Sequence, residues 1–578
     1  MTTIENINDY FKLPIYYNKD KMELQKNIIE DLELIESKDP SGSSVLGNIL
    51  KSKQSSESTD SVFTDQVIKQ IPNLYTTDVD FLKETQTLLK KYKPYVNEKP
   101  FSQNSFYKLW NEIKNDNGFK DKYYYINWST WDFLNHSDSF LQIMSVYNMS
   151  SPIISLLIPV FIAIIPFFMI KIKGLRITFN EYISILKILA SNHAIGKLFT
   201  DFNMVNFNQK IFMIISAAFY VFSIYQNILQ CIRFYRNMNI IYKSIDTINE
   251  YIDLYLSKFD YFNNHTKTLN SYEAFNNENA KHAAVLKNLK TNINGLQKSL
   301  NFKSYGEIGK TLKYFYEIYD NKELNEAFLY SFGFNGYLDV LDNFKIHIIN
   351  ENVNIAEFTK NKEKNKLSQS YYAILYDKTP IKNDVKLDKS LIVTGPNASG
   401  KTTILKSTLI NIIFSQQFGY GFYEKAKLFP YKYIHCYLNI PDTSGRDSLF
   451  QAEARRCKDI IDCINNNKTD RHFCVFDELY SGTNPYEAII GGYAMMNYLS
   501  KIKNVNCLLT THYTKLCEKL RKNENIKNYN MKTMQLPNGD FKYTYVMCPG
   551  ISNKKGGVKV LEDMNYPTEI IKEIKNSF

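Results

Sequence analysis

The stretch Leu391–Thr403, LIVTGPNASGKTT, decides the fold of the C-terminal part of this chain. Three apolar residues lead to a glycine turn, and a lysine followed by two threonines opens a second apolar stretch, TILKSTLINIIF. Residues 395–402 satisfy the pattern GxxxxGK[ST] between a predicted strand and a predicted helix, which is the context that makes the pattern specific. The stretch therefore predicts an α/β domain that holds a nucleotide.

The residues of this loop suit a triphosphate and a metal ion. Its glycines let backbone N–H groups curl around phosphate oxygens, Lys401 reaches the β- and γ-phosphates, and Thr402 presents its hydroxyl to Mg²⁺. We therefore expect ATP and Mg²⁺ as cofactors. The loop residues expected to contact them are Gly395, Pro396, Asn397, Ala398, Ser399, Gly400, Lys401, Thr402 and Thr403.

The next motif, FCVFDELYSGTNPYEA (Phe473–Ala488), is an apolar strand that ends in two carboxylates. Asp477 can hold the metal ion together with Thr402, and Glu478 can orient and deprotonate an attacking water. Two adjacent acids at a strand end can also be solvated surface. Their place after four apolar residues, downstream of a phosphate loop, favours the catalytic interpretation.

Two further segments place polar side chains at the ends of predicted elements. NCLLTTHYTKL puts His512 at the end of a strand, where it can sense the γ-phosphate or bind the water, although a single histidine is more often structural. SGRDSLFQAEARR (Ser444–Arg456) opens a helix whose N–H groups, with the Ser448 hydroxyl, suit an anion. Since the chain's own loop already holds the phosphates, this second anion site is expected to serve the ATP of another subunit. The predicted catalytic residues are thus Lys401, Glu478 and His512.

Size and charge leave several partner classes open. At 578 residues the chain is expected to form three or more units, and its net charge of +11 suits nucleic acid, phospholipid or nucleotide. All eight cysteines lie at or after Cys231, without a CxxC pair or a neighbouring histidine at metal spacing. We therefore expect no zinc site or disulfide framework, and a reducing intracellular compartment.

Composition changes along the chain predict its organisation. The polar stretch KSKQSSESTDS predicts a linker or disordered segment, and helical periodicity follows it. Beyond about residue 370, the runs YYAILYD, SLIVTG, FCVFDE and NCLLTTH predict the strands of a doubly wound α/β domain. The expected regions are 1–65, a polar, partly disordered arm; 66–139, a helical core segment; 140–232, a hydrophobic region; 233–369, a helical core and lever; and 370–578, the ATPase domain.

The hydrophobic region contains two charge-free runs. Phe140–Ile170 is long enough to cross a bilayer, and Ile211–Ile232 is a weaker candidate because Ser, Gln and Asn interrupt it. We expect transmembrane helices at about 150–170 and 211–231, with buried core helices as the alternative. One feature argues against a hairpin that spans the membrane. Such a hairpin would keep its two ends on the side of the nucleotide and send the connecting segment across, whereas the cations of that segment favour the side of the nucleotide. These cations are Lys171, Lys173, Arg176, Lys187, Lys197 and Lys210.

Together the motifs resemble the MutS family of DNA mismatch-repair ATPases, within the ABC-type class. The phosphate loop, the Asp477-Glu478 pair and TTHY match its ATPase motifs, and Ser448, Phe450 and Glu453 match its signature S-x-F-x-x-E. The resemblance implies that Gln417, in the family's Q-x-G, contacts nucleotide. It also implies a homodimer or heterodimer in which Ser448 completes the partner's ATP site, a C-terminal dimerisation helix within 555–574, and DNA binding through helical arms.

The sequence also departs from that family. The mismatch-reading pattern G-x-F-x-E has no fitting match, because Phe315-Tyr316-Glu317 lies inside a helical pattern and lacks the glycine. Direct reading of mismatches is therefore doubtful, while coupling of ATP to DNA in repair or recombination remains the leading expectation. The alternative is a membrane-bound ABC-type ATPase that acts on a protein or lipid partner and has no DNA role. A scaffold without catalysis is disfavoured because every catalytic position is occupied.

Overall fold

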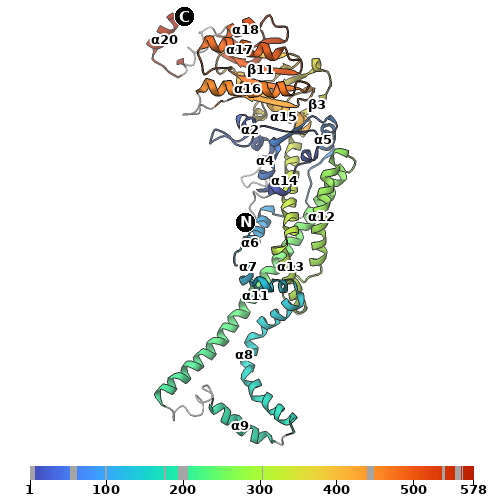
Figure 1. The fold of residues 1–578 in the computed structure, drawn as a ribbon, viewed down its shortest axis with the longest axis vertical. Helices are drawn as coiled ribbons and strands as arrows, with labels where there is room; N and C mark the ends of the chain where they lie inside the picture. Colours follow the sequence, from blue (N-terminus) through green and yellow to red (C-terminus); the bar gives the residue numbers. More distant parts are fainter. Residues whose placement is uncertain are drawn as a thin grey trace. The chain divides into compact units, whose positions relative to one another are not determined.

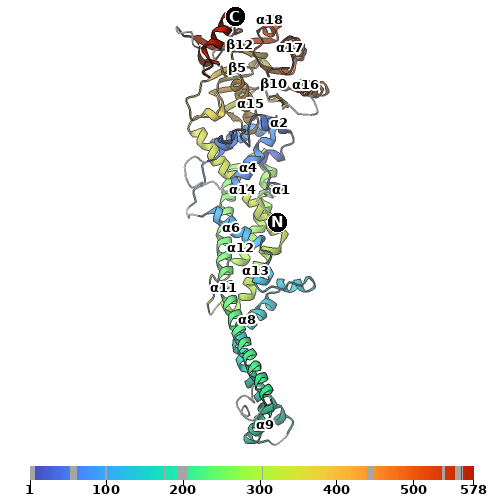
Figure 2. The same ribbon diagram turned by 90° about the vertical axis from the view of Figure 1, so that its left-hand side faces the viewer.

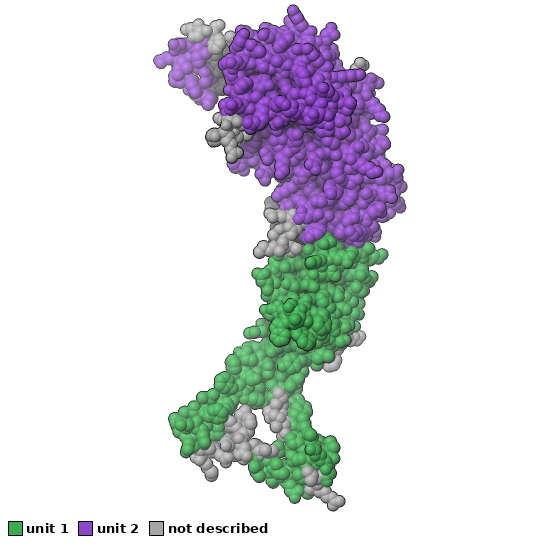
Figure 3. All heavy atoms as spheres, viewed as in Figure 1, with its two compact units in different colours: residues 1–2, 101–256, 283–328 green, residues 3–100, 257–282, 329–578 purple. Residues whose placement is uncertain are grey.

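The computed structural model describes residues 7–51, 62–97, 101–174, 177–192, 206–301, 304–438, 440, 448–536, 541–552, 561–562 and 564–577. The chain divides into two compact units (Figure 3). Unit 1 comprises residues 1–2, 101–256 and 283–328, and unit 2 comprises residues 3–100, 257–282 and 329–578. Three helices contribute residues to both units: α11 (Phe207–Thr266), α12 (Glu273–Ile293) and α14 (Lys322–Ile349).

Unit 1 is helical in its described residues. Its aromatic side chains form the core, where the rings of Phe106 and Tyr251 stack with centroids 4.0 Å apart. Phe315 and Tyr316 are fully buried in α13, which confirms that the three-letter match to a mismatch-reading motif lies inside a helix. Its other elements are α6 (Gln103–Lys114), α7 (Phe119–Lys122), η4 (Ser129–His136), α8 (Asp138–Ile172), α9 (Phe179–Asn192), η6 (Ser304–Gly306) and α13 (Ile308–Asp320).

The apolar runs of the sequence lie in α8 and α11, which leave the rest of unit 1 from neighbouring positions and spread apart, with α9 beyond the far end of α8 (Figures 1 and 2). By length and composition alone, segments within these two helices could cross a membrane: Asp138–Leu157 in α8, and α11. Only 22% of the first segment's apolar window and 6% of that in α11 are buried. The alternative of buried core helices therefore does not fit, and membrane insertion stays a prediction.

The N-terminal part of unit 2 is ordered where the structure describes it. Although the sequence suggests a polar arm, Phe11, Ile28 and Leu50 are fully buried, because these apolar residues pack against the helices that follow. The stretch 52–61, expected to be a linker, lies outside the described residues. The elements are α1 (Ile7–Tyr10), η2 (Pro14–Tyr17), β1 (Lys21–Glu23), α2 (Lys26–Asp31), α3 (Val45–Leu50), α4 (Val62–Gln70), η3 (Ile71–Asn73), β2 (Leu74–Thr76), α5 (Val79–Lys91) and η5 (Asn270–Tyr272).

A six-stranded sheet in the order β13-β12-β6-β11-β10-β9 forms the centre of the C-terminal domain. Its strands are parallel except for the antiparallel edge strand β13, as expected for a doubly wound domain. The elements are β6 (Ser390–Thr394), α15 (Lys401–Phe418), β9 (Tyr433–Tyr437), α16 (Leu449–Asn466), β10 (His472–Asp477), α17 (Pro485–Ser500), β11 (Val505–Thr511), α18 (Thr514–Leu520), β12 (Ile526–Gln535), β13 (Phe541–Pro549) and α20 (Thr568–Ser577).

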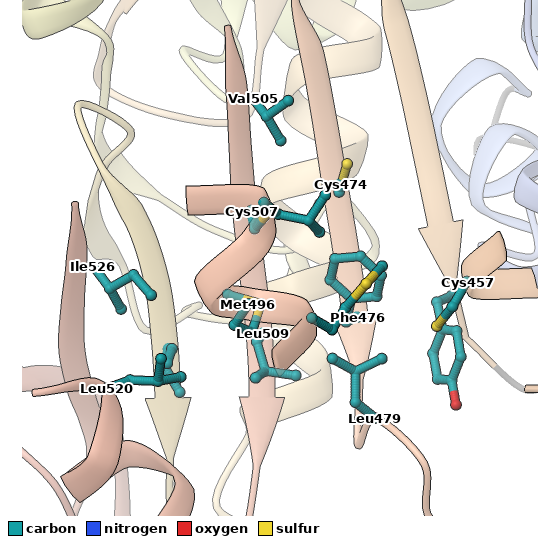
Figure 4. Packing of buried hydrophobic residues seen from close by; sticks show 14 of the residues in the cluster. Cys457, Cys474, Phe476, Leu479, Met496, Val505, Cys507, Leu509, Leu520 and Ile526 are labelled. Carbon is teal, nitrogen blue, oxygen red and sulfur yellow. The ribbon is translucent and has the colours of Figure 1, made fainter. Parts of the chain in front are cut away.

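Helices α16, α17 and α18 cover one face of this sheet through a continuous apolar layer. Phe476 and Leu509, fully buried, contribute from the strands, and Met496 contributes from α17 (Figure 4). Cys474 and Cys507 lie directly opposite each other on β10 and β11, and both are free thiols. The layer fixes the strands, and through them the loops at their carboxyl ends.

A second, five-stranded sheet has the order β5-β4-β8-β3-β7. Two of its strands begin before residue 370, so β structure begins earlier than the sequence suggested. The expected strand YYAILYD is wrong: it contains the 3₁₀ turn η8, because the backbone leaves the sheet where Tyr371 donates its N–H to the carbonyl of Phe422. The elements are β3 (Asn354–Phe358), η7 (Lys362–Lys364), β4 (Lys366–Ser370), η8 (Ala373–Leu375), β5 (Asn383–Lys386), β7 (Tyr420–Gly421) and β8 (Lys425–Leu428).

Candidate active site

Strand register brings the predicted site residues to one edge of the six-stranded sheet. Asp477 pairs with Thr510, and Thr511 pairs with Thr394, the last residue before the phosphate loop. Parallel strands end at the same edge, so the loops after β6, β10 and β11 meet there. The structure therefore gathers the loop, the two acids and His512 in one place.

The predicted metal ligands are in direct contact. Thr402 donates from Oγ1 to Oδ2 of Asp477 at 2.9 Å. Thr510 donates to the other carboxylate oxygen of Asp477, a contact that no local sequence pattern indicates. A threonine hydroxyl and a carboxylate oxygen at this distance suit a hard cation such as Mg²⁺, which prefers oxygen ligands.

The loop between β6 and α15 has the backbone of an anion cradle. Ala398 and Gly400 both have positive φ, 61° and 95°, so successive N–H groups turn inward. Lys401 is 6% exposed and donates from Nζ to the carbonyl of Pro396 at 3.2 Å. Burial lowers the pKa of its ammonium, while the carboxylates of Glu478 and Asp477 favour the charged form. An incoming phosphate can replace the Pro396 carbonyl as the partner of this ammonium.

Glu478 and His512 form a pair beside the loop. His512 Nδ1 lies 3.3 Å from Glu478 Oε1. This hydrogen bond lowers the pKa of the Glu478 carboxyl, and the charge of Lys401 adds to the shift against the effect of burial. Glu478 adopts a left-handed backbone with φ of 51°, which departs from the extended course of the strand before it. The carboxylate is therefore ionised and held in place, as a general base requires.

Ser448 caps α16 and is exposed. Its hydroxyl accepts from Gln451 N at 3.3 Å, and Ser448 N donates in return to Oε1 of Gln451 at 2.9 Å. Further along the helix, Glu453 is 2% exposed and accepts from Ser481 Oγ at 2.9 Å and from Gly482 N at 3.1 Å. The helix start is thus tied to the loop that follows Glu478. Residues 444–447 of this motif lie outside the described residues.

Gln417 does not join this cluster, which corrects its assignment as a nucleotide contact. It lies near the C-terminal end of α15, and at 1.5 Å per residue this is roughly 24 Å along the helix from Lys401. Both of its amide protons are used, since Nε2 donates to the carbonyls of Ile71 at 2.8 Å and Leu74 at 2.9 Å. Its role is to hold the N-terminal segment of unit 2 against α15.

A cavity of about 330 Å³ adjoins the phosphate loop. Gly400 and Thr403 form one wall, and the ring of Tyr545 lies so close to Gly400 that a Cβ there would meet it at 3.1 Å. Tyr371 and Ile381 contribute from the segment around β5. No sequence pattern marks this cavity, because its walls come from distant segments that share no motif.

The fold also brings together histidine and cysteine side chains that are far apart in sequence. His435, Cys463 and His472 have their ligand atoms within 4.8 Å of one another. Their geometry is satisfied without an ion, since His435 Nε2 lies 3.1 Å from His472 Nδ1 and His472 Nε2 lies 3.0 Å from the carbonyl of Asn467. We therefore treat this cluster as part of the packing between β9, β10 and α16.

A doubly wound sheet with a phosphate loop, a hydroxyl–carboxylate metal pair and a carboxylate–histidine pair at one edge defines a nucleotide-binding α/β domain of the ATPase type. Comparison with protein families identifies the kind of domain more closely, because residues 391–578 match MutS domain V. The C-terminal third of the chain is thus similar to domain V of the MutS family.

Individual relatives agree over the same part. The chain is similar to the DNA mismatch repair protein MutS of Persephonella marina, with 29% identity over 212 residues, covering 36% of this chain and 24% of the relative. The corresponding proteins of Parabacteroides distasonis (31% over 199 residues; 33% and 22%) and Aquifex pyrophilus (26% over 204 residues; 35% and 23%) are similar in the same way. The chain thus spans less than a quarter of the length of these three relatives.

Proposed function

We propose that this protein binds and hydrolyses ATP at the edge of the six-stranded sheet. The observation that carries the proposal is the convergence there of the phosphate loop, the Thr402–Asp477 contact and the Glu478–His512 pair. MutS-family members are ATPases, which supports the same activity. The cavity beside Gly400 is large enough for the base and ribose of the nucleotide.

The chain's own groups suggest how hydrolysis proceeds. The loop N–H groups and Lys401 hold the β- and γ-phosphates, while Thr402 and Asp477 would hold Mg²⁺, which neutralises phosphate charge. Glu478 orients a water in line with the γ-phosphorus and accepts its proton as the new P–O bond forms. The bond from the γ-phosphorus to the β–γ bridging oxygen breaks, and the electron pair leaves with ADP. His512 holds the Glu478 carboxylate in position.

The active unit proposed here is a dimer, either of two copies of this chain or with a relative. Ser448 lies exposed at the start of α16, at the positive end of the helix dipole. In the dimer, this helix start faces the γ-phosphate held by the partner's loop. Helix α20 is proposed to contribute to the dimer contact, while half of the segment between it and β13 lies outside the described residues.

The first candidate partner is DNA. The relatives are named for DNA mismatch repair, and the net charge of +11 suits a polyanion. The test is the ATPase rate of the purified full chain with homoduplex, mismatched and branched DNA over a salt series. We expect stimulation that weakens steeply with salt and disappears in Lys401→Ala. A rate that does not respond to any DNA would exclude this coupling.

A second candidate function is that of a membrane-bound ATPase without a DNA role. The observation that favours it is the exposure of apolar side chains along α8 and α11. Fractionation of cells that express the full chain tests it, since a membrane-bound protein is extracted only with detergent. Recovery in the soluble fraction would exclude this function.

A further inference from the structure

The pair of helices α8 and α11 has its polar side chains on the inside. Gln230 of α11 donates from Nε2 to Oδ1 of Asn148 on α8 at 2.9 Å, and Tyr220 donates to the carbonyl of Ser155 at 3.1 Å. Near these contacts, Asn148 and Ser151 of α8 are 3% and 5% exposed. Polar groups thus link the two antiparallel helices where they meet.

The outward surfaces of the same helices are apolar. Phe161 and Phe168 on α8 are 51% and 57% exposed, and Phe212 and Phe219 on α11 are 65% and 69% exposed. Burying one such side chain is worth about 1.5–3 kcal/mol, so leaving a whole surface of them in water is unfavourable. A polar inside and an apolar outside reverse the order of a water-soluble bundle and match that of helices in lipid.

The dimensions also match a bilayer. The charge-free run Ile211–Ile232 of α11 is on the order of 30 Å long at 1.5 Å per residue, which equals the thickness of the hydrocarbon core. Apolar side chains emerge on several sides of each helix rather than along one stripe. Since a protein groove covers only one stripe of a helix, a fluid hydrocarbon surrounding is the better occupant than a second protein.

A cluster of exposed aromatic residues lies where the apolar run of α11 ends. Trp128, Trp131 and Phe133, in and just before η4, are 74%, 52% and 63% exposed. The chain just before them is fixed beside α11, because Asn237 donates to the carbonyl of Lys122 and the rings of Tyr124 and Phe234 lie 5.9 Å apart.

Cations lie at the same level of α11, since Arg233 and Arg236 directly follow its apolar run. Tryptophan prefers the boundary between hydrocarbon and headgroups, and arginine pairs with anionic headgroups. We name Trp128, Trp131 and Phe133 the aromatic collar.

We propose that the α8–α11 hairpin is embedded in a lipid bilayer through its outward apolar surfaces, with the aromatic collar at headgroup level and Arg233 and Arg236 against anionic headgroups. This inference rests on the second of the two proposed functions, and it adds which residues meet lipid and at what depth. The inward polar residues hold the two helices together within the bilayer.

The first test is flotation of the full chain with vesicles of phosphatidylcholine and phosphatidylglycerol, followed by an alkaline carbonate wash. We expect the protein to float and to resist the wash. The double variant Phe161→Glu/Phe219→Glu should lose flotation, whereas Ile349→Glu, at a site in unit 2 that is 63% exposed, should retain it. Release by carbonate, or flotation of the double variant, would overturn embedding.

The second test measures depth by quenching of tryptophan fluorescence with phosphatidylcholines brominated at different acyl positions. Of the three tryptophans, Trp110 is 1% exposed in the core of unit 1 and serves as the internal reference. Quenching should be strongest for bromine nearest the headgroup and should vanish in Trp128→Phe/Trp131→Phe. Equal quenching in that variant, or strongest quenching at the bilayer centre, would overturn the collar.

ATP hydrolysis in the same vesicles tests the proposed ATPase function separately from the embedding of the hairpin. Lys401→Ala should float unchanged while it loses turnover. A chain that floats and is also stimulated by DNA would support the embedded hairpin while refuting the membrane function without DNA.

Discussion

Replacing Glu478 with glutamine tests the general base directly. The change removes the carboxylate charge and keeps the size of the side chain. His512 Nδ1, which lies 3.3 Å from Glu478 Oε1, therefore keeps a hydrogen-bond acceptor in the amide oxygen. The His512 hydrogen bond keeps the pKa of Glu478 below its ordinary value, so the carboxylate is the populated form at neutral pH and its whole contribution is lost. General-base catalysis contributes about 10²- to 10⁴-fold, or roughly 2.7–5.4 kcal/mol of the barrier.

In Glu478→Gln the affinity for ATP, unlike the rate of hydrolysis, should not fall. Glu478 lies close enough to Lys401 for the two charges to interact, so it also lies near the γ-phosphate. Removing one negative charge there leaves the affinity for ATP equal or higher. We expect Glu478→Gln to bind ATP, to hydrolyse it at least about a hundredfold more slowly, and to accumulate as a closed dimer.

The assay is single-turnover phosphate release, with ATP binding measured in parallel by fluorescence titration and dimer formation by light scattering. Glu487→Gln is the matched control, because it makes the same chemical change at an exposed position in the first turn of α17. The control should keep its rate. If Glu478→Gln binds ATP and its rate falls by less than about tenfold, the assignment of Glu478 as the base is refuted.

Lys401→Ala should abolish ATP binding or turnover, measured by titration and phosphate release, because the phosphates lose their buried cation. Ser448→Arg should impair turnover but leave ATP binding by the isolated monomer intact, and a mixture with Lys401→Ala should restore one composite site; stable mixed dimers without activity would contradict the shared site. Glu453→Ala leaves Gly482 N–H without its carboxylate, so urea unfolding should show a loss of about 1–3 kcal/mol. Burial lowers the pKa of His435 to about 3, so the unfolded chain takes up a proton at higher pH than the folded chain. The free energy of unfolding should therefore fall by about 1.4 kcal/mol per pH unit as the pH drops below the ordinary pKa of 6.5. In urea unfolding at a series of pH values, His435→Asn should reduce this slope.

Much of the site was predictable because its signals are local. An apolar run followed by a glycine loop predicts a strand and a phosphate cradle, and both β6 and α15 are confirmed. The carboxylates after β10 and the histidine after β11 follow the same logic, because the ends of parallel strands meet at one edge. Thr510 was missed because its place beside Asp477 depends on strand register, which no local pattern encodes.

Other predictions failed where tertiary contacts override local pattern. Gln417 matches a family motif, yet the length of α15 carries it away from the nucleotide loop and toward the carbonyls of Ile71 and Leu74. The run at Tyr371 has the composition of a strand, but its backbone pairs with Phe422 and turns. Short apolar runs are ambiguous by periodicity alone, and packing decides between the outcomes.

The sequence by itself determined the chemistry of the nucleotide loop and the presence of two long apolar runs, because both depend on residues that are neighbours along the chain. Only the tertiary structure decided that Thr402, Asp477 and Thr510 share one site, since strand register sets their distances. It alone showed that Asn148 faces inward and Phe219 outward, because the orientation of a side chain on a helix becomes meaningful only when the neighbouring helix is in place.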